Sequence, residues 1–262
     1  MNRMKFTAQE LYVLAMAAGK EKMYGIPDGF ALIPDEERPA VRQQVSDALQ
    51  DEGVLVMDFD GKVSVCPEYT ELINVYCDCR KCLTVNRQRA DGTAEDKIFW
   101  QYNGKLYCAE ALEDDYVFRT VSEAEVKADL LQEKWLSVGA SQHVESVIPQ
   151  IALTKAKRHA MKNMDEDALR LLKQNGADGR TASVIYDGLQ EKAQYLGLLL
   201  MEPSSDDCKK TEKAWLSSRG VLFAMRKAIV NYRTSVAFTE ADAESVSVGI
   251  EELAAEFFGR AR

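Results

Sequence analysis

The hydrophobic and polar positions near the N-terminus predict three helices and one β-hairpin. The first helix begins at Thr7, where Thr-Ala-Gln-Glu has the form of a capping box, and a second covers 41–49 and ends at Gly53. Two short apolar runs flank Asp60-Gly61, a pair that favours the tight turn of a hairpin. Pro67 is typical of the first turn of a helix and predicts the start of the third.

The middle of the chain has the pattern of an antiparallel meander. Apolar or alternating runs predict strands at 82–86, 98–100, 105–108 and 115–121. Asn103-Gly104 predicts a hairpin turn, and the polar segment 87–96 predicts a loop between the first two strands. Ser122 and Glu125 repeat the capping-box form, which predicts a helix that runs to about Trp135.

The C-terminal part of the chain repeats the spacing of this meander. Four identical pairs lie 116 positions apart: Lys97 and Lys213, Gly104 and Gly220, Leu106 and Leu222, and Tyr116 and Tyr232. After one inserted residue, the sequence at 121–125 recurs in similar form at 238–242. The repeat favours a strand at 220–230, where periodicity alone would allow a helix. We therefore predict an internal duplication of a unit built as helix, meander and helix.

A basic helical stretch lies between the two copies. Residues 149–164 include Lys155, Lys157, Arg158 and Lys162 and no acidic residue, with Met161 on an apolar edge beside them. A second short helix from Asp165 and a loop at 175–179 follow. A run of charge is most often a solvated helix face, and the alternative is a docking face for an acidic or amphipathic helical partner.

The composition is that of a soluble globular protein. The chain has 33 Lys and Arg against 42 Asp and Glu, a net charge of −9, and 46% hydrophobic residues. This acidic balance argues against a general affinity for nucleic acid or anionic lipid. The longest apolar run, 195–201, is far shorter than the ~20 residues of a membrane helix, and no export signal is visible at the N-terminus. We therefore predict a cytoplasmic protein without membrane insertion.

Asp58 and Asp60 support a competing enzyme hypothesis. The segment 54–61 resembles the first motif of haloacid-dehalogenase-type phosphatases, in which the first Asp attacks phosphorus, the second is the acid/base, and Mg²⁺ lies between them. However, Lys62 stands where that family has Thr, and no later strand ends in a Gly-Asp or Asp-Asp pair. A hairpin with an Asp-Gly turn is the simpler interpretation.

Cys77, Cys79 and Cys82 could supply three thiolates to zinc. The fourth ligand would have to be Cys66 or Cys108, because His143 and His159 are distant in sequence and no second Cys pair completes a zinc-finger spacing. Three such residues are more often small buried apolar side chains. We predict no metal and no cofactor, although the sequence alone leaves zinc binding by the three cysteines open.

The first 66 residues could form a winged helix, which would make the protein a DNA-binding regulator. The presumptive reading helix at 35–52 carries six acidic residues against Arg38 and Arg42. Phosphate would repel such a helix, so nucleic-acid binding is not expected.

No Gly-rich phosphate loop, Ser/His/Asp order, Cys/His pair or His-Glu metal pair is visible in the sequence, and this favours a binding protein over an enzyme. The element order supplies a more specific hypothesis. An N-terminal helix, a helix that ends with Ala48, Leu49, Gly53 and Val54, and a helix that leads into a long meander together resemble the EspG chaperones of mycobacterial type VII secretion. The layout is also similar to an EspG-like family of Gram-positive bacteria outside the mycobacteria.

This resemblance implies a fold, a function and a partner. The implied fold is a single α+β domain, 1–262, with a central antiparallel sheet from two quasi-symmetric halves, 1–135 and 136–262, and flanking helical bundles. The implied function is a non-enzymatic chaperone or adaptor that keeps a secreted helical-hairpin client soluble until export. The identity of the client is not implied, and a homo-oligomer stays open.

The resemblance also implies regions of contact with the client. Mycobacterial members bind a paired-helix substrate through a loop between central strands and through C-terminal helices, whose nearest equivalents here are 87–96, 149–164 and 240–258. We predict that the following residues of the first two regions bind the partner: Arg87, Arg89, Lys155, Lys157, Arg158 and Met161.

Overall fold

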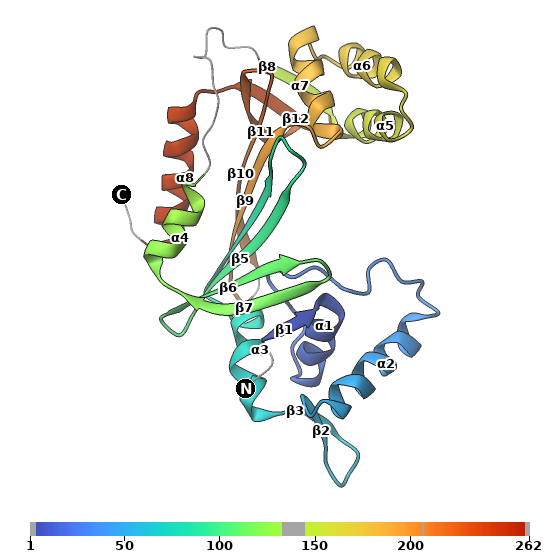
Figure 1. Cartoon of the computed structure of the whole chain (residues 1–262), viewed down its shortest axis with the longest axis vertical. Helices are drawn as coiled ribbons and strands as arrows, with labels where there is room; N and C mark the ends of the chain where they lie inside the picture. The colour runs from blue at the N-terminus through green and yellow to red at the C-terminus, as the bar shows by residue number, and fades with distance from the viewer. Residues whose placement is uncertain (1–3, 133–144, 206, 260–262) are drawn as a thin grey trace. The chain divides into compact units, whose positions relative to one another are not determined.

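The computed structural model describes residues 4–132, 145–205 and 207–259. Within these residues the fold is α+β, with a ten-stranded sheet and a separate two-stranded hairpin, β2–β3 (Figure 1). The predicted α+β class with an antiparallel sheet is confirmed. The hydrogen-bonded order of the large sheet is β1-β7-β6-β5-β4-β9-β10-β11-β12-β8.

The connections between strands and helices vary in length, and the segment 18–37 between α1 and α2 is a long one. The strands are β1 (Lys5–Thr7), β2 (Leu55–Met57), β3 (Val63–Val65), β4 (Lys81–Gln88), β5 (Ala94–Tyr102), β6 (Lys105–Leu112), β7 (Asp115–Val121), β8 (Glu145–Pro149), β9 (Gln194–Pro203), β10 (Cys208–Ser218), β11 (Val221–Val230) and β12 (Arg233–Glu240). The helices are α1 (Ala8–Ala17), α2 (Arg38–Asp51), the short 3₁₀ helix η1 (Pro67–Tyr69), α3 (Thr70–Cys77), α4 (Glu123–Leu130), α5 (Gln150–Met161), α6 (Asp165–Gln174), α7 (Gly179–Leu189) and α8 (Ala243–Phe258). None of these helices has the length and apolar character needed to cross a membrane.

The chain divides into two compact units. The first comprises Met1–Thr84, Asp96–Val126 and Leu200–Lys210. Both predicted capping boxes at its helix starts are confirmed: Thr7 and Glu10 exchange hydrogen bonds at α1, and Ser122 and Glu125 do so at α4.

The core of the first unit fixes the loop that follows α1. The buried Trp100 ring stacks on Phe118, and its Nε1 donates a hydrogen bond of 2.8 Å to the Tyr24 carbonyl. Gly25 follows with φ of +85°, and a Cβ there would lie 2.6 Å from Cγ2 of Ile98. Only glycine tolerates both the backbone conformation and this close approach, so the loop lies directly against the sheet.

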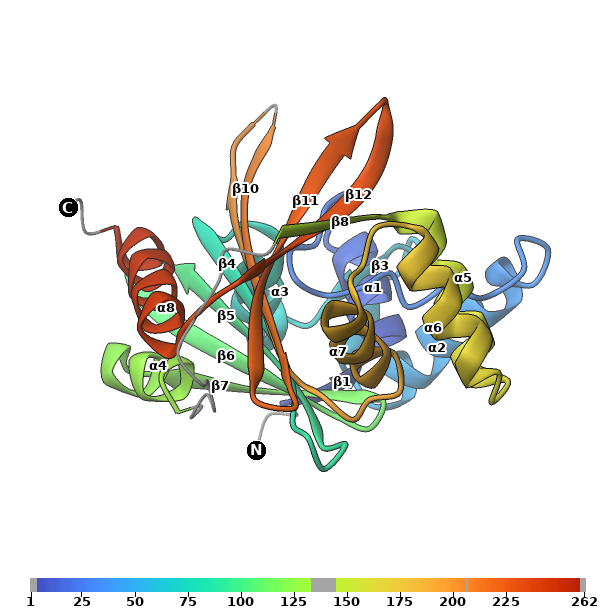
Figure 2. The same cartoon turned by 90° about the horizontal axis from the view of Figure 1, so that it is seen from above.

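The second unit comprises Val85–Glu95, Lys127–Leu199 and Thr211–Arg262. Its helices α5, α6 and α7 form a cluster with β8 and β12 (Figure 2). The buried face of α5 consists of Ala152, Ala156 and Ala160, and these small side chains allow close packing against the neighbouring helices. The long basic side chains of α5, by contrast, are exposed to solvent.

The predicted register of the repeated hairpin is confirmed. Phe99 pairs with Cys108 in β5–β6, and Trp215 pairs with Ala224 in β10–β11, which preserves the offset of 116 on both strands. Gly104 and Gly220 occupy the same turn position with φ of +74° and +72°. The strand predicted at 220–230 is likewise confirmed as β11.

The predicted register of the next hairpin is wrong. Leu106 pairs with Val121, 15 positions later, whereas the Leu222 carbonyl accepts a hydrogen bond from the amide of Ala241, 19 positions later. The hairpin β11–β12 is thus four residues longer than β6–β7. The counterpart of the Ser122 cap is therefore Asp242, which caps α8, and not a residue of 238–241.

The match between Tyr116 and Tyr232 was also misleading. Tyr116 lies inside β7, whereas Tyr232 lies in the turn between β11 and β12. The division into halves at 135 and 136 stays a prediction, because this boundary and Trp135 lie outside the described residues. The two compact units do not follow that division, since Val85–Glu95 belongs to the second unit.

Candidate binding surfaces

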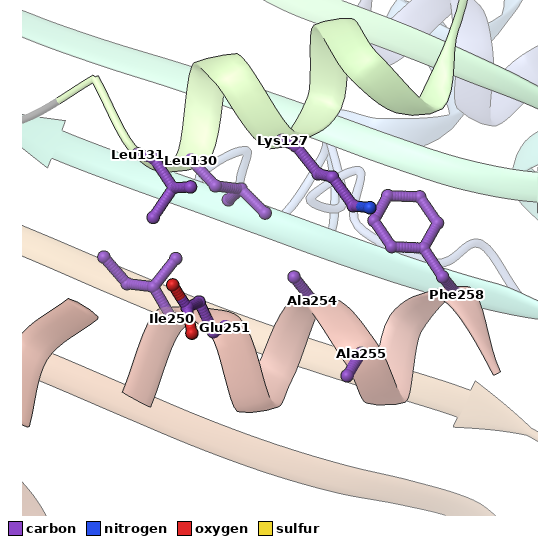
Figure 3. Close-up of a pocket in the computed structure, with 8 residues that line it drawn as sticks. All are labelled: Lys127, Leu130, Leu131, Ile250, Glu251, Ala254, Ala255 and Phe258. Atoms are coloured by element: carbon purple, nitrogen blue, oxygen red, sulfur yellow. The ribbon is translucent and has the colours of Figure 1, made fainter. Parts of the chain in front are cut away.

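An apolar groove of about 300 Å³ lies between the end of α4 and α8 (Figure 3). It is lined by residues of these two helices and the position after α4: Lys127, Leu130, Leu131, Ile250, Glu251, Ala254, Ala255 and Phe258. All of these residues belong to the second compact unit.

Two stripes of α8 explain how the groove arises. The helix begins at the Asp242 cap and ends at Gly259, which has φ of +71°. Leu253 and Phe257 are buried on the side that holds the helix in place. On the neighbouring stripe, Ala254 and Ala255 have small side chains that do not fill the space between the two helices, so the groove stays open.

The groove carries one charged residue of each sign at its edge. The Lys127 ammonium lies 5.4 Å from the centre of the Phe258 ring, a cation–π contact, and Glu251 is an exposed carboxylate beside Ile250 (Figure 3). The rest of the lining is apolar. Such a groove fits one or two apolar side chains of a partner.

The predicted basic residues of α5 lie together on its solvent face. Lys155, Lys157 and Arg158 are exposed, and the Met161 side chain beside them is 74% exposed. In the part of the chain that the structure describes, none of the three cations forms an ion pair. Cations and an exposed apolar side chain at helical spacing form a surface that an acidic amphipathic helix could contact.

The loop predicted at 87–96 is shorter than expected. β4 continues to Gln88 and β5 begins at Ala94, so only 89–93 connect them. Arg89 is exposed in this connection, and its predicted role in partner binding stays untested. Arg87 instead lies within β4, and its guanidinium donates to the carbonyl of Asp129 at 2.6 Å and to its carboxylate at 2.9 Å. Arg87 is therefore already occupied inside the protein, and its predicted role in partner binding stays untested.

Asp58 and Asp60 lie in an exposed hairpin turn. The Asp58 carboxylate accepts hydrogen bonds from the amides of Asp60 and Lys62, at 3.0 and 2.8 Å. The preceding strand, β2, is only three residues long and exposes Met57. This is the geometry of a hairpin with an Asp-Gly turn and not of a buried strand that ends at a catalytic pair.

The two cations of the presumptive reading helix, which the structure describes, both have partners within the protein. Arg38 pairs with Asp35, and the guanidinium of Arg42 lies 5.1 and 5.2 Å from the ring centres of Tyr12 and Phe30. Both cations of this helix are therefore engaged within the protein, and little positive charge is left for phosphate.

The three clustered cysteines are buried. Burial raises the pKa of Cys77 and of Cys79 to about 12 and raises the pKa of Cys82 well above its ordinary value. Across the described residues, no three His, Cys, Asp or Glu side chains gather in a way that could hold a metal ion. The thiols therefore have the character of packed core groups.

We expect alkylation to separate the cysteines into two classes. With a pKa of about 12, only about one Cys77 or Cys79 thiol in ten thousand is ionised at pH 8, so iodoacetamide should leave both unmodified in the native protein. The half-buried Cys66 and Cys208 should react first. Peptide mass spectrometry reads out each site, with the denatured chain as the control in which all six react. Native labelling of Cys79 as fast as that of Cys208 would contradict this assignment.

Comparison with solved structures gives a distant likeness. No protein-family model and no curated protein matches the chain. Among solved structures, the chain is similar to the Mycobacterium tuberculosis type VII secretion system chaperone EspG5, solved in complex with a PE25–PPE41 dimer. The identity is 11%, the match covers 94% of each chain, and the TM-score is 0.46. A likeness this distant does not assign a function.

Proposed function

We propose that this protein is a non-enzymatic binding protein, a cytoplasmic chaperone or adaptor for a helical-hairpin client of type VII secretion. The open apolar groove between α4 and α8 is the observation that carries the binding role. A groove bordered by two helices receives the apolar stripe of a third, because anchor side chains at helical spacing then lose contact with water. The client class follows from the element order of the sequence, which resembles that of the EspG chaperones.

The size of the groove suits a client that must later leave. At about 300 Å³ it admits only one or two large side chains, so the buried area and the affinity are modest. Modest affinity gives fast dissociation, since differences in affinity among related complexes lie mostly in the rate of release. The charged residues at the edge, Lys127 and Glu251, would orient the client helix without holding it tightly.

The exposed face of α5 is a second contact in this proposal. Lys155, Lys157 and Arg158 would face carboxylates on the client, and Met161 would provide flexible apolar contact. Such exposed charge pairs contribute little to affinity but raise the rate of encounter. The α5 face therefore predicts that client capture slows as the salt concentration rises.

Co-expression with the products of the neighbouring genes tests the proposal. We expect one small helical-hairpin protein to co-purify with the tagged chain in fixed stoichiometry. Failure of every neighbour to co-purify would contradict the chaperone role. Magnesium-dependent hydrolysis of a phosphoester that is lost in Asp58→Asn would instead support the phosphatase, and salt-sensitive binding to duplex DNA would support the regulator.

A pair of tryptophan variants tests the groove itself. Ala255→Trp fills the groove, and we expect it to weaken binding of the co-purified client by about tenfold or more, as loss of a central anchor site does. Ser247→Trp places the same side chain on an exposed position of α8 outside the groove and is the matched control. Titration of labelled client by fluorescence anisotropy gives both affinities. Equal affinities of the two variants for the client would show that the client does not bind in this groove.

A further inference from the structure

The turn between β11 and β12 holds an aromatic residue where the backbone favours glycine. Asn231 and Tyr232 both have positive φ, +49° and +61°. Gly104 and Gly220 occupy the position of Tyr232 in the hairpins β5–β6 and β10–β11. A bulky residue is disfavoured in this conformation, yet the Tyr232 side chain is 104% exposed and contributes nothing to the core. The unfavourable backbone conformation of Tyr232 is therefore not offset by packing of its side chain.

The residues beside this turn are apolar and basic. Ile229 is 75% exposed, and Val230 is also exposed. Lys227 and Arg233 flank them, and neither forms an ion pair with any described residue. The whole segment 225–235 contains no Asp or Glu, although the chain as a whole carries a net charge of −9. We call residues 227–233 the finger.

The counterpart in the first copy of the repeat has the opposite character. The turn between β6 and β7 is formed by Glu113 and Asp114, and the adjoining Asp115 pairs with Lys5. The hairpin that bears the finger is also the one lengthened by four residues, as the pairings of Leu106 and Leu222 show. Extension and reversal of charge therefore occur together at the same tip.

A further apolar side chain begins close to the finger. Pro149 at the end of β8 pairs with Ser235 of β12, and α5 starts at the next residue. Ile151 in its first turn is 64% exposed. Figure 2 shows the hairpin of β11 and β12 projecting past β8 and the start of α5, so the finger is a convex protrusion of this unit.

We propose that the finger binds the surface of an anionic membrane. Ile229, Val230 and Tyr232 would enter the interfacial layer, where tyrosine is favoured, and Lys227 and Arg233 would face the lipid phosphates. A convex tip offers no cleft for a small ligand, whereas a deformable lipid surface can accommodate it. The negative charge of the rest of the chain opposes this only weakly, because charges farther than ~8 Å are screened at physiological salt.

Co-sedimentation of the full chain with vesicles tests this proposal. We expect binding to vesicles of phosphatidylcholine mixed with an equal amount of phosphatidylglycerol, decreasing as salt rises, and little binding to phosphatidylcholine alone. Lys227→Gln combined with Arg233→Gln should weaken binding roughly 25-fold, at roughly fivefold for each cation. Tyr232→Gly should also weaken binding, while the melting temperature stays the same or rises because glycine suits the turn.

The matched control is Glu113→Gly, which also replaces a turn residue of positive φ by glycine, in the counterpart hairpin, and should leave vesicle binding unchanged. Circular dichroism and thermal melting verify that each variant is folded. The proposal is overturned if no anionic vesicle binds, or if the finger variants bind as the parent does. It is also overturned if vesicle binding is abolished by Lys157→Gln with Arg158→Gln and not by the finger variants. Loss of a protein partner by the finger variants, with vesicle binding unchanged, would overturn it as well.

Discussion

Asp129→Ala is expected to lower the free energy of unfolding by about 3–5 kcal/mol. The Arg87 side chain is only 1% exposed, and Asp129 supplies both a carboxylate and a backbone carbonyl to it. Loss of the carboxylate leaves a buried guanidinium that Glu95, 3.5 Å away, compensates only in part. Urea unfolding monitored by circular dichroism measures the effect as a lower midpoint with an unchanged slope.

Two companion variants distinguish the buried charge from the side chain that bears it. Arg87→Met should cost less than Asp129→Ala, because the carboxylates it releases are more exposed than the guanidinium and can be hydrated. Arg89→Ala, on the exposed connection next to β4, should change stability by no more than about 0.5 kcal/mol. A larger loss in Arg87→Met than in Asp129→Ala would mean that packing of the arginine stem, and not its charge, holds this part of the unit.

Features set by neighbours in sequence could be predicted from the sequence. The capping boxes at Thr7 and Ser122 and the hairpin turn at Asn103-Gly104 each depend on a few adjacent residues, and the structure has all three. The same holds for the basic helix α5, whose apolar positions recur at helical spacing. The repeated spacing then extended this local information to β11, because β10–β11 pairs in the same register as β5–β6 at the offset of 116.

Features set by distant residues could not be predicted in this way. The burial of Arg87 depends on Asp129, which is 42 positions away in sequence. The local sequence therefore indicates only a polar loop at Arg87. The leucine-rich run at 195–201 has no polar alternation, because β9 buries residues on both faces, and it gave no strand signal. α7 was also not predicted, although Asp178 caps it through the amides of Arg180 and Thr181.

The binding surfaces show the same limit. The sequence indicated 240–258 only through a family resemblance, and nothing in it indicated that Leu131 would lie across a groove from Ile250. The offset of 116 matches Tyr232 with Tyr116, a strand residue, and so gives no sign of the turn at Tyr232. The offset does not hold there because the two hairpins differ in length. A turn signal could have corrected this, because Asn231 is typical of the first position of such a turn.

Trp100→Ala is expected to destabilise the first unit by about 3–5 kcal/mol. The indole is fully buried, and its ring lies 5.6 Å from that of Phe118 at an interplanar angle of 12°. Alanine would leave a cavity that the neighbouring strands cannot close, because the ring is held between the sheet and the loop at Tyr24. Thermal and urea unfolding measure the loss.

Trp100→Phe separates packing from hydrogen bonding at this position. Phenylalanine keeps the stacked arrangement with Phe118 but removes the Nε1 donor, which leaves the partly buried Tyr24 carbonyl without this partner. We expect a loss of about 1–3 kcal/mol, together with faster amide hydrogen exchange in the loop 24–30. Unchanged exchange with the full loss of stability would attribute the effect to ring volume alone. Fast exchange with little loss of global stability would mean that the indole fixes the loop and the sheet core is stable without it.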